Sequence, residues 1–291
     1  MSIKTFELVY TALNSQESNV GVIIVAAGSA SRMAGTNKIL APIMGKSVIS
    51  HTLLAFNNHP LVGDIVLVTR KDMILDLQKE VEKGGFNKVT DIIEGGNCRE
   101  ESVKKGFQRL IKNEKIKTVL IHDGARPLVG EDVIDRVIKA SEEFMATVPA
   151  VRVKDTIKRI GTLGKVEETV DRENLVHIQT PQGFAVSVLK DSFEKAGEDL
   201  SLFTDDASLA ERANYPVYTV EGDYKNIKIT TPEDLILAEA YIKSIEGNII
   251  TNTLEVPSDT TNVEINKAWT DNDNKAQKRP ESIKVDILNG N

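Results

Sequence analysis

The stretch from residue 20 to residue 38, VGVIIVAAGSASRMAGTNK, constrains the fold more than any other part of the chain. It opens with a short apolar run, Val20 to Val25, which is typical of a central parallel strand buried on both faces. The run ends in small residues that let main-chain N–H groups approach an anion closely: Ala26, Ala27, Gly28, Ser29, Ala30 and Ser31. Arg32 and Lys38 follow on the same loop. This order favours a nucleoside triphosphate site, and the alternative is a tight strand-to-helix turn with solvated cations.

Two other phosphate-binding loops do not fit the sequence. The dinucleotide fingerprint G-x-G-x-x-G requires glycines at the places of Ala30 and Met33. Gly45-Lys46-Ser47 resembles the end of a P-loop, but Leu40 occupies the place of its first glycine. We therefore expect Gly45 and Lys46 to form the turn before a helix that begins near Ser47.

The composition indicates a folded, acidic protein. The 291 residues, 41% of them apolar, are enough for one large domain or two modest ones. The net charge of −7 argues against a general nucleic-acid binder, because neutralising a phosphate backbone requires a basic surface. No window resembles a membrane span, and the first residues lack the apolar core of a signal peptide. The single cysteine, Cys98, excludes an internal disulfide, so we expect a cytoplasmic protein with no nucleic-acid or membrane partner.

Strand-like and helix-like apolar patterns alternate along the chain. After the first strand, strands are expected at residues 64–69, 89–93, 117–122, 146–153, 217–220 and 227–230. Helices are expected at residues 48–58, 73–83, 99–112, 131–144, 186–195 and 204–213, and a last one opens at Thr231. The alternation predicts an α/β fold with a Rossmann-like, mostly parallel sheet and helices on both faces. In such sheets ligands bind beyond the carboxyl ends of the strands.

Three segments depart from this alternation. Residues 154–180 are short polar pieces around Gly161 and Gly164, which indicates a β-arm projecting from the sheet. Residues 1–19 are interpreted as an N-terminal extension of the domain at residues 20–246. From residue 247 to residue 291 the composition shifts to Asn, Thr, Asp, Lys and Ser, so we expect a largely disordered tail. This tail contains the only tryptophan, Trp269.

A glycine turn follows the third predicted strand. Gly95 and Gly96 lead into a helix whose free N–H groups face the same sheet edge as the first loop. Arg99 and Ser102, three residues apart, can share one face of that helix. The cluster would suit a pocket for a base and ribose, and an ordinary capped helix start is an equally good reading.

A second cluster, HDGARP, follows the fourth predicted strand. Asp123 can hold Mg²⁺ or accept a substrate hydroxyl, and Arg126 can bind a phosphate. His122 points to the other side of the strand and is given no role.

Two later residues are also candidates. Thr204 precedes a helix that it and two acids could cap, while Lys228 could face inward or outward with equal ease. No Ser–His–Asp or metal-ligand cluster is apparent, so the fitting chemistry is an attack on phosphorus, stabilised by cations and backbone donors.

Several of these stretches, in this order, resemble one family of enzymes. AAGSASRM with Lys38, GGNCREESV, HDGARP, VDRENL with QTPQGF, DDASL and NIKITTPEDL are similar to segments of the 2-C-methyl-D-erythritol 4-phosphate cytidylyltransferases. These are GT-A-like nucleotidyltransferases of the non-mevalonate isoprenoid pathway. The resemblance runs from about residue 20 to residue 246.

The resemblance implies that the phosphate of methylerythritol phosphate attacks the α-phosphorus of CTP, giving a CDP-alcohol and pyrophosphate, with Mg²⁺ as cofactor. By position, Arg32 and Lys38 would stabilise the transition state, and Arg172 and Lys228 would position the sugar phosphate. The nucleotide would be held by Ala26, Ala27, Gly28, Ser29, Gly95, Arg99, Ser102 and Asp123. The sugar phosphate would be bound by Asp123, Arg126, Thr156, Thr180 and Thr204, with Asp123 also the candidate metal ligand. The family is a homodimer with interlocked arms, so residues of one arm would reach the partner's site.

The sequence departs from the family pattern at a few positions. NKIL stands where PKQ is common, Asn97 replaces a frequent acid and Val176 a frequent Trp. Two alternatives stay open: a ribitol 5-phosphate cytidylyltransferase with the same fold, and a catalytically idle relative that only binds nucleotides. HDGARP favours the erythritol enzyme over the first. Arg32, Lys38, Asp123 and Lys228 argue against the second, because a nucleotide sensor needs no cations for a transition state.

Overall fold

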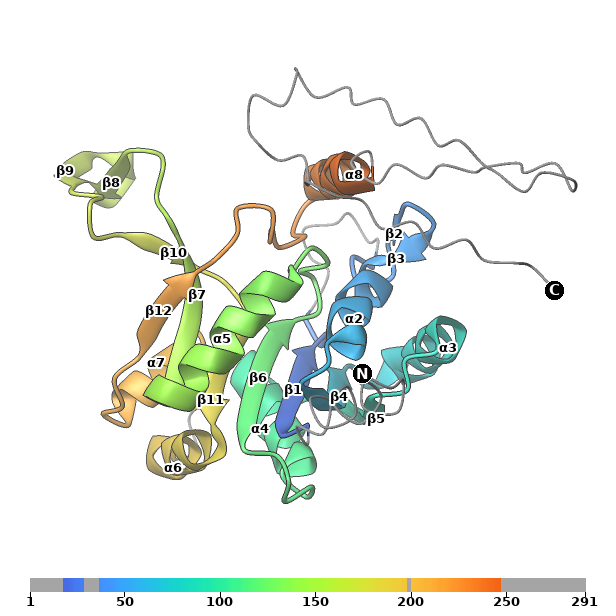
Figure 1. Cartoon of the computed structure of the whole chain (residues 1–291). Helices are drawn as coiled ribbons and strands as arrows, with labels where there is room; N and C mark the ends of the chain where they lie inside the picture. The colour runs from blue at the N-terminus through green and yellow to red at the C-terminus, as the bar shows by residue number, and fades with distance from the viewer. Residues whose placement is uncertain (1–17, 29–36, 198–199, 247–291) are drawn as a thin grey trace, which may run out of the picture. The chain divides into compact units, whose positions relative to one another are not determined.

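The computed structural model describes residues 18–28, 37–197 and 200–246. All of them lie within residues 1–248, the first of the two units into which the chain divides. The main strands are β1 (Val20–Val25), β4 (Val62–Thr69), β5 (Val89–Glu94), β6 (Thr118–Asp123), β7 (Ala146–Arg152), β10 (Val176–Ile178), β11 (Gln182–Ala185) and β12 (Tyr218–Glu221). They form one sheet in the order β10-β7-β11-β6-β1-β4-β5, with β12 paired to β7 (Figure 1).

Strand β1 lies inside this sheet, as its apolar run predicted. It pairs in parallel with β4 on one side and β6 on the other. Gly21 interrupts the run because helix packing leaves no room there: a Cβ would lie 2.6 Å from Leu110 Cδ2. The predicted mostly parallel sheet is confirmed. The antiparallel strands are β10, which pairs with β7, and β11, which lies between β6 and β7 and runs opposite to both.

Helices cover both faces of the sheet. The α-helices are α2 (Val48–Asn58), α3 (Ile74–Gly84), α4 (Arg99–Leu110), α5 (Glu131–Phe144), α6 (Val186–Ala196), α7 (Asp206–Arg212) and α8 (Pro232–Glu246). Short 3₁₀ turns are η1 (Lys71–Met73), η2 (Thr162–Gly164) and η3 (Leu200–Leu202). Successive residues of β1 point to opposite faces: Ile24 packs in the cluster with α2, α3 and α5, whereas Ile23 packs with α4, α6 and α7. The predicted helices at residues 48–58 and 131–144 are confirmed without change.

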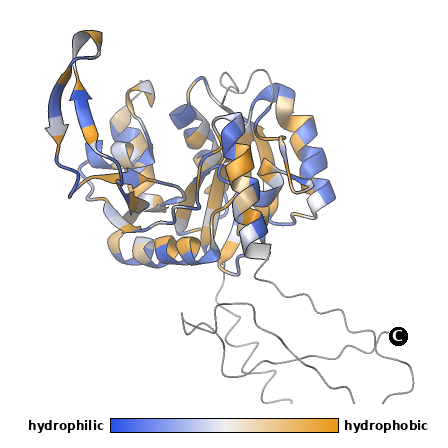
Figure 2. Cartoon of the chain, turned by 90° about the horizontal axis from the view of Figure 1, so that it is seen from above, coloured by the Kyte–Doolittle hydropathy of each residue, from blue (hydrophilic) through white to orange (hydrophobic). Residues whose placement is uncertain are grey.

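A two-stranded hairpin projects from the sheet within the segment that the sequence assigned to the arm. Its strands are β8 (Ile157–Ile160) and β9 (Val166–Val170), which pair only with each other among the described residues. The hairpin stands clear of the helices and the sheet in both views (Figures 1 and 2). Ile160 and Val166 are 65% and 54% exposed, and Leu163 at the tip is fully exposed. The last part of the segment, β10, returns to the main sheet.

The small turn before α2 agrees with the prediction at Gly45 but not at Lys46, which lies in a short strand. β2 (Pro42–Ile43) and β3 (Lys46–Ser47) form a hairpin, and its two turn residues, Met44 and Gly45, have φ values of 48° and 79°. Positive φ at both central residues matches the right-handed twist of such a hairpin, and glycine adopts it without strain. Ser47 then caps α2 by accepting a hydrogen bond from Ser50 N.

The strand predicted at residues 227–230 is wrong. These residues belong to no sheet, and Ile229 N instead donates to Ala125 O at 2.7 Å. Ile229 is fully buried, so the alternating apolar pattern reflects packing against the loop after β6 and not a strand ladder. Helix α8 begins directly afterwards, where Asp234 accepts hydrogen bonds from Thr230 N and Thr231 N. In the part of the chain that the structure describes, no helix is long and apolar enough to cross a membrane.

Candidate functional site

The carboxyl ends of β1, β5 and β6 border one cavity of about 310 Å³. It is lined by the small-residue loop after β1, the glycine turn after β5, and Asp123 at the end of β6, so the structure brings together three regions that the sequence singled out. Lys38 and Lys228 also line the cavity. Ser29 and Arg32, which were predicted on the first loop, lie outside the described residues.

Asn37 shapes the turn that carries Lys38. Its side-chain oxygen accepts a hydrogen bond from Ile39 N at 3.1 Å, and its carbonyl accepts one from Leu40 N at 3.1 Å. Its amide donates to Met73 Sδ. An Asn side chain that bonds the backbone two residues on is a frequent turn-former. The departure from the family pattern at this position is therefore compatible with a lysine on the cavity wall.

Ser102 organises the glycine turn after β5. Its hydroxyl donates to Cys98 O at 2.9 Å and accepts from Gly96 N at 3.0 Å. A Cβ on Gly95 would lie only 2.6 Å from the same hydroxyl oxygen, so this close approach requires glycine. Ser102 is almost fully buried. In this structure the Ser102 hydroxyl shapes the pocket wall, and the missing side chain of Gly95 lets the glycine turn pack directly against it.

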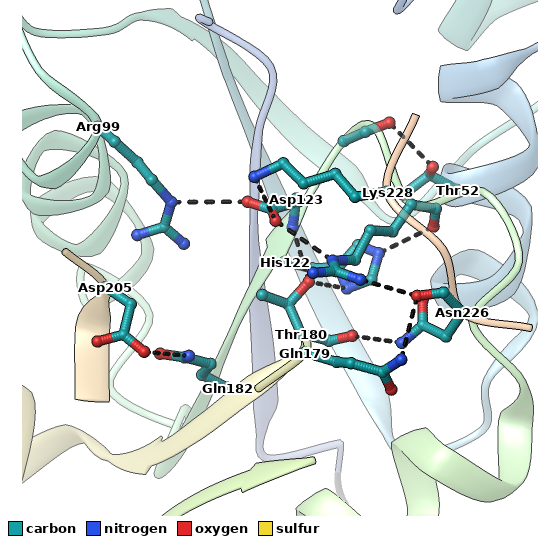
Figure 3. Close-up of polar contacts among 12 residues, drawn as sticks. Thr52, Arg99, His122, Asp123, Gln179, Thr180, Gln182, Asp205, Asn226 and Lys228 are labelled. Carbon is teal, nitrogen blue, oxygen red and sulfur yellow. Dashed lines mark hydrogen bonds and ion pairs between the residues drawn. The ribbon is translucent and has the colours of Figure 1, made fainter. Parts of the chain in front are cut away.

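Asp123 is the centre of a group of three cations (Figure 3). Lys228 Nζ lies 2.9 Å and Arg126 Nε 3.3 Å from Asp123 Oδ2, and Arg99 Nε lies 3.5 Å from Oδ1. Burial alone would raise the pKa of Asp123, but Lys228, Arg99 and Arg126 hold it well below its usual range. Asp123 is therefore a carboxylate, and the cavity wall beside it carries excess positive charge.

Arg99 is shared with a second carboxylate. Its Nη2 lies 2.8 Å from Asp206 Oδ2, and Asp206 is 1% exposed. Burial raises the pKa of Asp206, and the nearby guanidinium opposes that rise. Asp206 opens helix α7, whose N-cap Asp205 accepts from Ser208 N and also from Gln182 Nε2 at 2.8 Å. Gln182 accepts in turn from Ala207 N at 2.9 Å, which ties the start of α7 to β11.

His122 and Thr180 support Asp123 from behind. His122 Nε2 lies 3.1 Å from Arg126 O, a carbonyl that can only accept, so Nε2 carries the proton. In the neutral ring Nδ1 is then an acceptor, and the Thr180 hydroxyl donates to it at 3.0 Å while accepting from Asp123 N at 3.1 Å. Burial lowers the pKa of His122 to about 4, so the ring is neutral near pH 7. Thr180 was predicted to bind the substrate, but its hydroxyl is buried and committed to these two partners.

Two buried amides, which the sequence reasoning missed, hold the loop that carries Lys228. Gln179 donates to Asp223 O at 2.8 Å and accepts from Asp223 N at 3.2 Å. Asn226 donates to Thr180 O at 2.8 Å, and its carbonyl accepts from Arg126 Nη1 at 2.8 Å. These bonds fix the loop against the segment between β10 and β11, and Lys228 points inward toward Asp123 (Figure 3). The sequence pattern at both residues is an amide side chain beside apolar residues. This pattern occurs in many loops, so it does not single out these two.

Three other predicted residues are not brought to the cavity in a single chain. Thr156 and Arg172 are exposed at the base of the projecting hairpin, where Arg172 Nη1 donates to Lys154 O. Thr204 is exposed before α7, and its backbone N–H donates to Ser208 Oγ at 3.3 Å. Their assignment to a substrate stays a prediction.

The described residues do not fit a protein-bound Mg²⁺ at Asp123. Both oxygens of this carboxylate face cations, and the neighbouring Asp206 is covered by Arg99. No group of three or more His, Cys, Asp or Glu in the described part of the chain could hold a metal ion. Mg²⁺ prefers carboxylates combined with waters or substrate phosphates, whereas a cation at Asp123 would be repelled by Lys228, Arg126 and Arg99.

Comparison with known proteins agrees with this geometry. The family model for 2-C-methyl-D-erythritol 4-phosphate cytidylyltransferase matches residues 20–244. The enzyme of that name from Dehalococcoides mccartyi strain CBDB1 is 42% identical over 224 residues, which is 77% of this chain and 96% of the relative. The one from Bacillus velezensis is 43% identical over 229 residues, 78% of this chain and 97% of the relative. A second family model, the Cna protein B-type domain, matches residues 263–291, outside the described residues.

Solved structures give the same result. The crystal structure of 4-diphosphocytidyl-2C-methyl-D-erythritol synthase from Anaerococcus prevotii has a TM-score of 0.67 and 32% identity, covering 77% of this chain and 98% of that one. The cytidylyltransferase from Thermus thermophilus has a TM-score of 0.63 and 29% identity. The family match covers more than half of the chain and includes every segment that borders the cavity. The chain therefore belongs to the 2-C-methyl-D-erythritol 4-phosphate cytidylyltransferase family.

Proposed function

We propose that this protein transfers CMP from CTP to 2-C-methyl-D-erythritol 4-phosphate, giving 4-CDP-2-C-methyl-D-erythritol and pyrophosphate. The observation that carries the proposal is the cavity in which a small-residue loop faces a carboxylate surrounded by three cations. Backbone N–H groups suit a triphosphate, and the excess positive charge suits a second phosphorylated substrate. The family membership supplies the identities of the two substrates. The proposed setting is the cytoplasm.

The chemistry needs no protein nucleophile. An oxygen of the substrate phosphate attacks the α-phosphorus of CTP, a new P–O bond forms, and the bond to pyrophosphate breaks. Lys38, on the cavity wall, is proposed to stabilise the negative charge that develops at the α-phosphate, together with Arg32 on the same loop. Lys228 and Arg126, held beside Asp123, are proposed to bind the phosphate of the attacking substrate.

The Mg²⁺ requirement of the reaction is also a proposal. Because three cations surround the carboxylate of Asp123 and would repel a metal ion there, we propose that triphosphate oxygens and not Asp123 bind the ion. Replacing Asp123 would then weaken the binding of the polyol phosphate much more than the apparent affinity for Mg²⁺. Titration of turnover with Mg²⁺ at saturating CTP measures that affinity.

We further propose a homodimer in which the arm of one protomer serves the partner's cavity. Exposed Ile160, Leu163 and Val166 on the hairpin supply apolar surface for a partner. Arg172 at its base is exposed and away from the cavity lining of its own chain. Two inactive variants, Lys38→Ala and Arg172→Ala, can be unfolded and refolded together. If Arg172 acts on the partner's site, random pairing gives about half mixed dimers and restores about a quarter of wild-type activity. Mixed dimers of confirmed mass that stay inactive would contradict the shared site.

Pyrophosphate release tests the main proposal. The full-length protein is incubated with CTP and Mg²⁺ and with methylerythritol 4-phosphate, ribitol 5-phosphate or glycerol 3-phosphate in turn. We expect release with methylerythritol 4-phosphate at a kcat/KM at least tenfold above that with the other alcohols. Preference for ribitol 5-phosphate would reassign the second substrate within the same chemistry. Tight CTP binding without release from any alcohol phosphate would overturn the proposal and indicate an idle nucleotide-binding relative.

A further inference from the structure

Asp123 presents its two oxygens unequally. Oδ2 accepts a hydrogen bond from Arg126 Nε at 3.3 Å and pairs with Lys228 Nζ at 2.9 Å. Oδ1 has one cation nearby, Arg99 Nε at 3.5 Å, which is at the outer limit of a hydrogen bond. No described residue donates a hydrogen bond to Oδ1, although Asp123 lines the cavity. Oδ1 is therefore the oxygen that remains able to accept a hydrogen bond from a substrate hydroxyl.

The reason that Arg99 does not close on Oδ1 lies on the other side of its guanidinium. Asp206 Oδ2 is 2.8 Å from Arg99 Nη2, much closer than the 3.5 Å between Arg99 and Asp123. Asp206 is buried, and it sits at the start of α7, which Gln182 ties to β11. It cannot follow Arg99 toward the cavity. The pull of a fixed buried carboxylate holds the guanidinium back from Asp123.

We infer that Asp206 is a positioning residue that retains Arg99 and so keeps Asp123 Oδ1 available to a hydroxyl of the polyol phosphate. This inference rests on the proposed function, because it assigns the Asp123 side of the cavity to the attacking substrate. Without the charge of Asp206, Arg99 moves onto Oδ1 and forms a close pair with Asp123. The polyol phosphate must then break that pair before it can bind.

Asp206→Asn is the direct test because it removes the charge and keeps the shape. In this variant Arg99 competes with the substrate hydroxyl for Asp123 Oδ1. Losing that charge-assisted hydrogen bond should raise KM for the polyol phosphate by about tenfold or more. We expect kcat and KM for CTP to stay within about threefold of wild type. Asp205→Asn is the matched control: it makes the same charge change one residue earlier, and its remaining oxygen can still cap the helix. It loses the bond from Gln182 Nε2, but Gln182 still holds the start of α7 by accepting from Ala207 N. KM should stay within about twofold there, because Asp205 does not pair with Arg99.

A double-mutant cycle shows whether Asp206 acts through Arg99. In an Arg99→Met background there is no guanidinium to move, so adding Asp206→Asn should change KM for the polyol phosphate by less than about twofold. Arg99→Met alone leaves a buried carboxylate unpaired, so the double variant should melt at a higher temperature than Arg99→Met. This melting comparison needs no turnover and also applies if a single variant folds poorly.

The outcomes separate the inference from the proposed function. A wild-type protein that binds CTP but turns over no polyol phosphate overturns the proposed function. An active wild type whose Asp206→Asn variant keeps its KM overturns the inference. Equal losses in kcat and in CTP affinity would also overturn it, since they indicate general damage to the site. A tenfold KM effect that persists unchanged without Arg99 would show that Asp206 acts by another route.

Discussion

The Thr180 hydroxyl makes a demanding test of how the site is built. It accepts from Asp123 N at 3.1 Å and donates to His122 Nδ1 at 3.0 Å, in a setting where Thr180 is 5% exposed. Thr180→Val keeps the shape of the side chain but removes both bonds. Two buried polar groups then lose their partner in one substitution.

The expected loss follows from those two groups. A buried donor or acceptor left without a partner costs about 1–3 kcal/mol, so the pair should lower the free energy of unfolding by about 2–6 kcal/mol. For a domain of this size, where 1 kcal/mol shifts the melting temperature by about 2–4 °C, that corresponds to a melting temperature lower by roughly 4–24 °C. The activity with the polyol phosphate should fall as well, because the backbone of Asp123 loses its anchor.

Thermal unfolding without any ligand is the assay, and Thr180→Ser is the control. Serine keeps the hydroxyl and should recover most of the lost stability. A substrate-binding Thr180 would behave differently: its valine variant would raise KM while the ligand-free protein melted as before. A Thr180→Val protein that melts within about 2 °C of wild type would refute the supporting role described for this residue.

Three further predictions concern the rest of the domain. In the unfolded chain His122 takes up a proton near pH 6.5, whereas the buried ring stays neutral down to its pKa of about 4. The free energy of unfolding should therefore fall by about 1.4 kcal/mol for each pH unit from about 6.5 to 5. Urea titrations at several pH values measure this slope, which should be smaller by about 1.4 kcal/mol per pH unit in His122→Asn. Gly95→Ala places a Cβ 2.6 Å from Ser102 Oγ and should weaken CTP binding about tenfold, measured by calorimetry, whereas unchanged affinity would mean that the wall can move aside. Deleting residues 249–291 should leave melting temperature and kcat/KM unchanged, because the family match ends at residue 244; a loss of several degrees would show that the second unit supports the first.

The parts of the site that the sequence predicted are those that follow strands directly. An apolar run such as β1 has one plausible place, inside a parallel sheet, and the carboxyl ends of such strands meet at one edge. Asp123 therefore had to lie near Ala26 and Ala27, as it does. Helices α2 and α5 were predicted at their observed bounds because each shows a clear helical apolar spacing.

The supporting residues could not be predicted in the same way. Gln179 and Asp223 are hydrogen-bonded although they are 44 positions apart in the chain. Neither lies in a strand or helix, so no periodic pattern shows on which side its side chain lies. The alternating pattern around Lys228 allowed its side chain to face either inward or outward. The hydrogen bond from Ile229 N to Ala125 O fixes the backbone so that Lys228 faces inward. Asp206 was interpreted as part of a helix cap, which is the common use of an acid there. Its pairing with Arg99 depends on how α4 and α7 meet, which local patterns do not specify.

The placement of β11 between β6 and β7 has a consequence for synthesis of the protein. Both neighbours precede it in the chain, so β6 is complete about sixty residues before β11 arrives to cover it. At translation speeds of about 5–20 residues per second that interval lasts roughly 3–12 s, during which β6 and then β7 would expose unpaired backbone groups beside apolar surface. A nascent chain whose part outside the ribosome ends within the β8–β9 hairpin would carry that open gap, and ribosome-bound chaperones should engage it there more than at any earlier point. The projecting hairpin thus delays closure of the sheet.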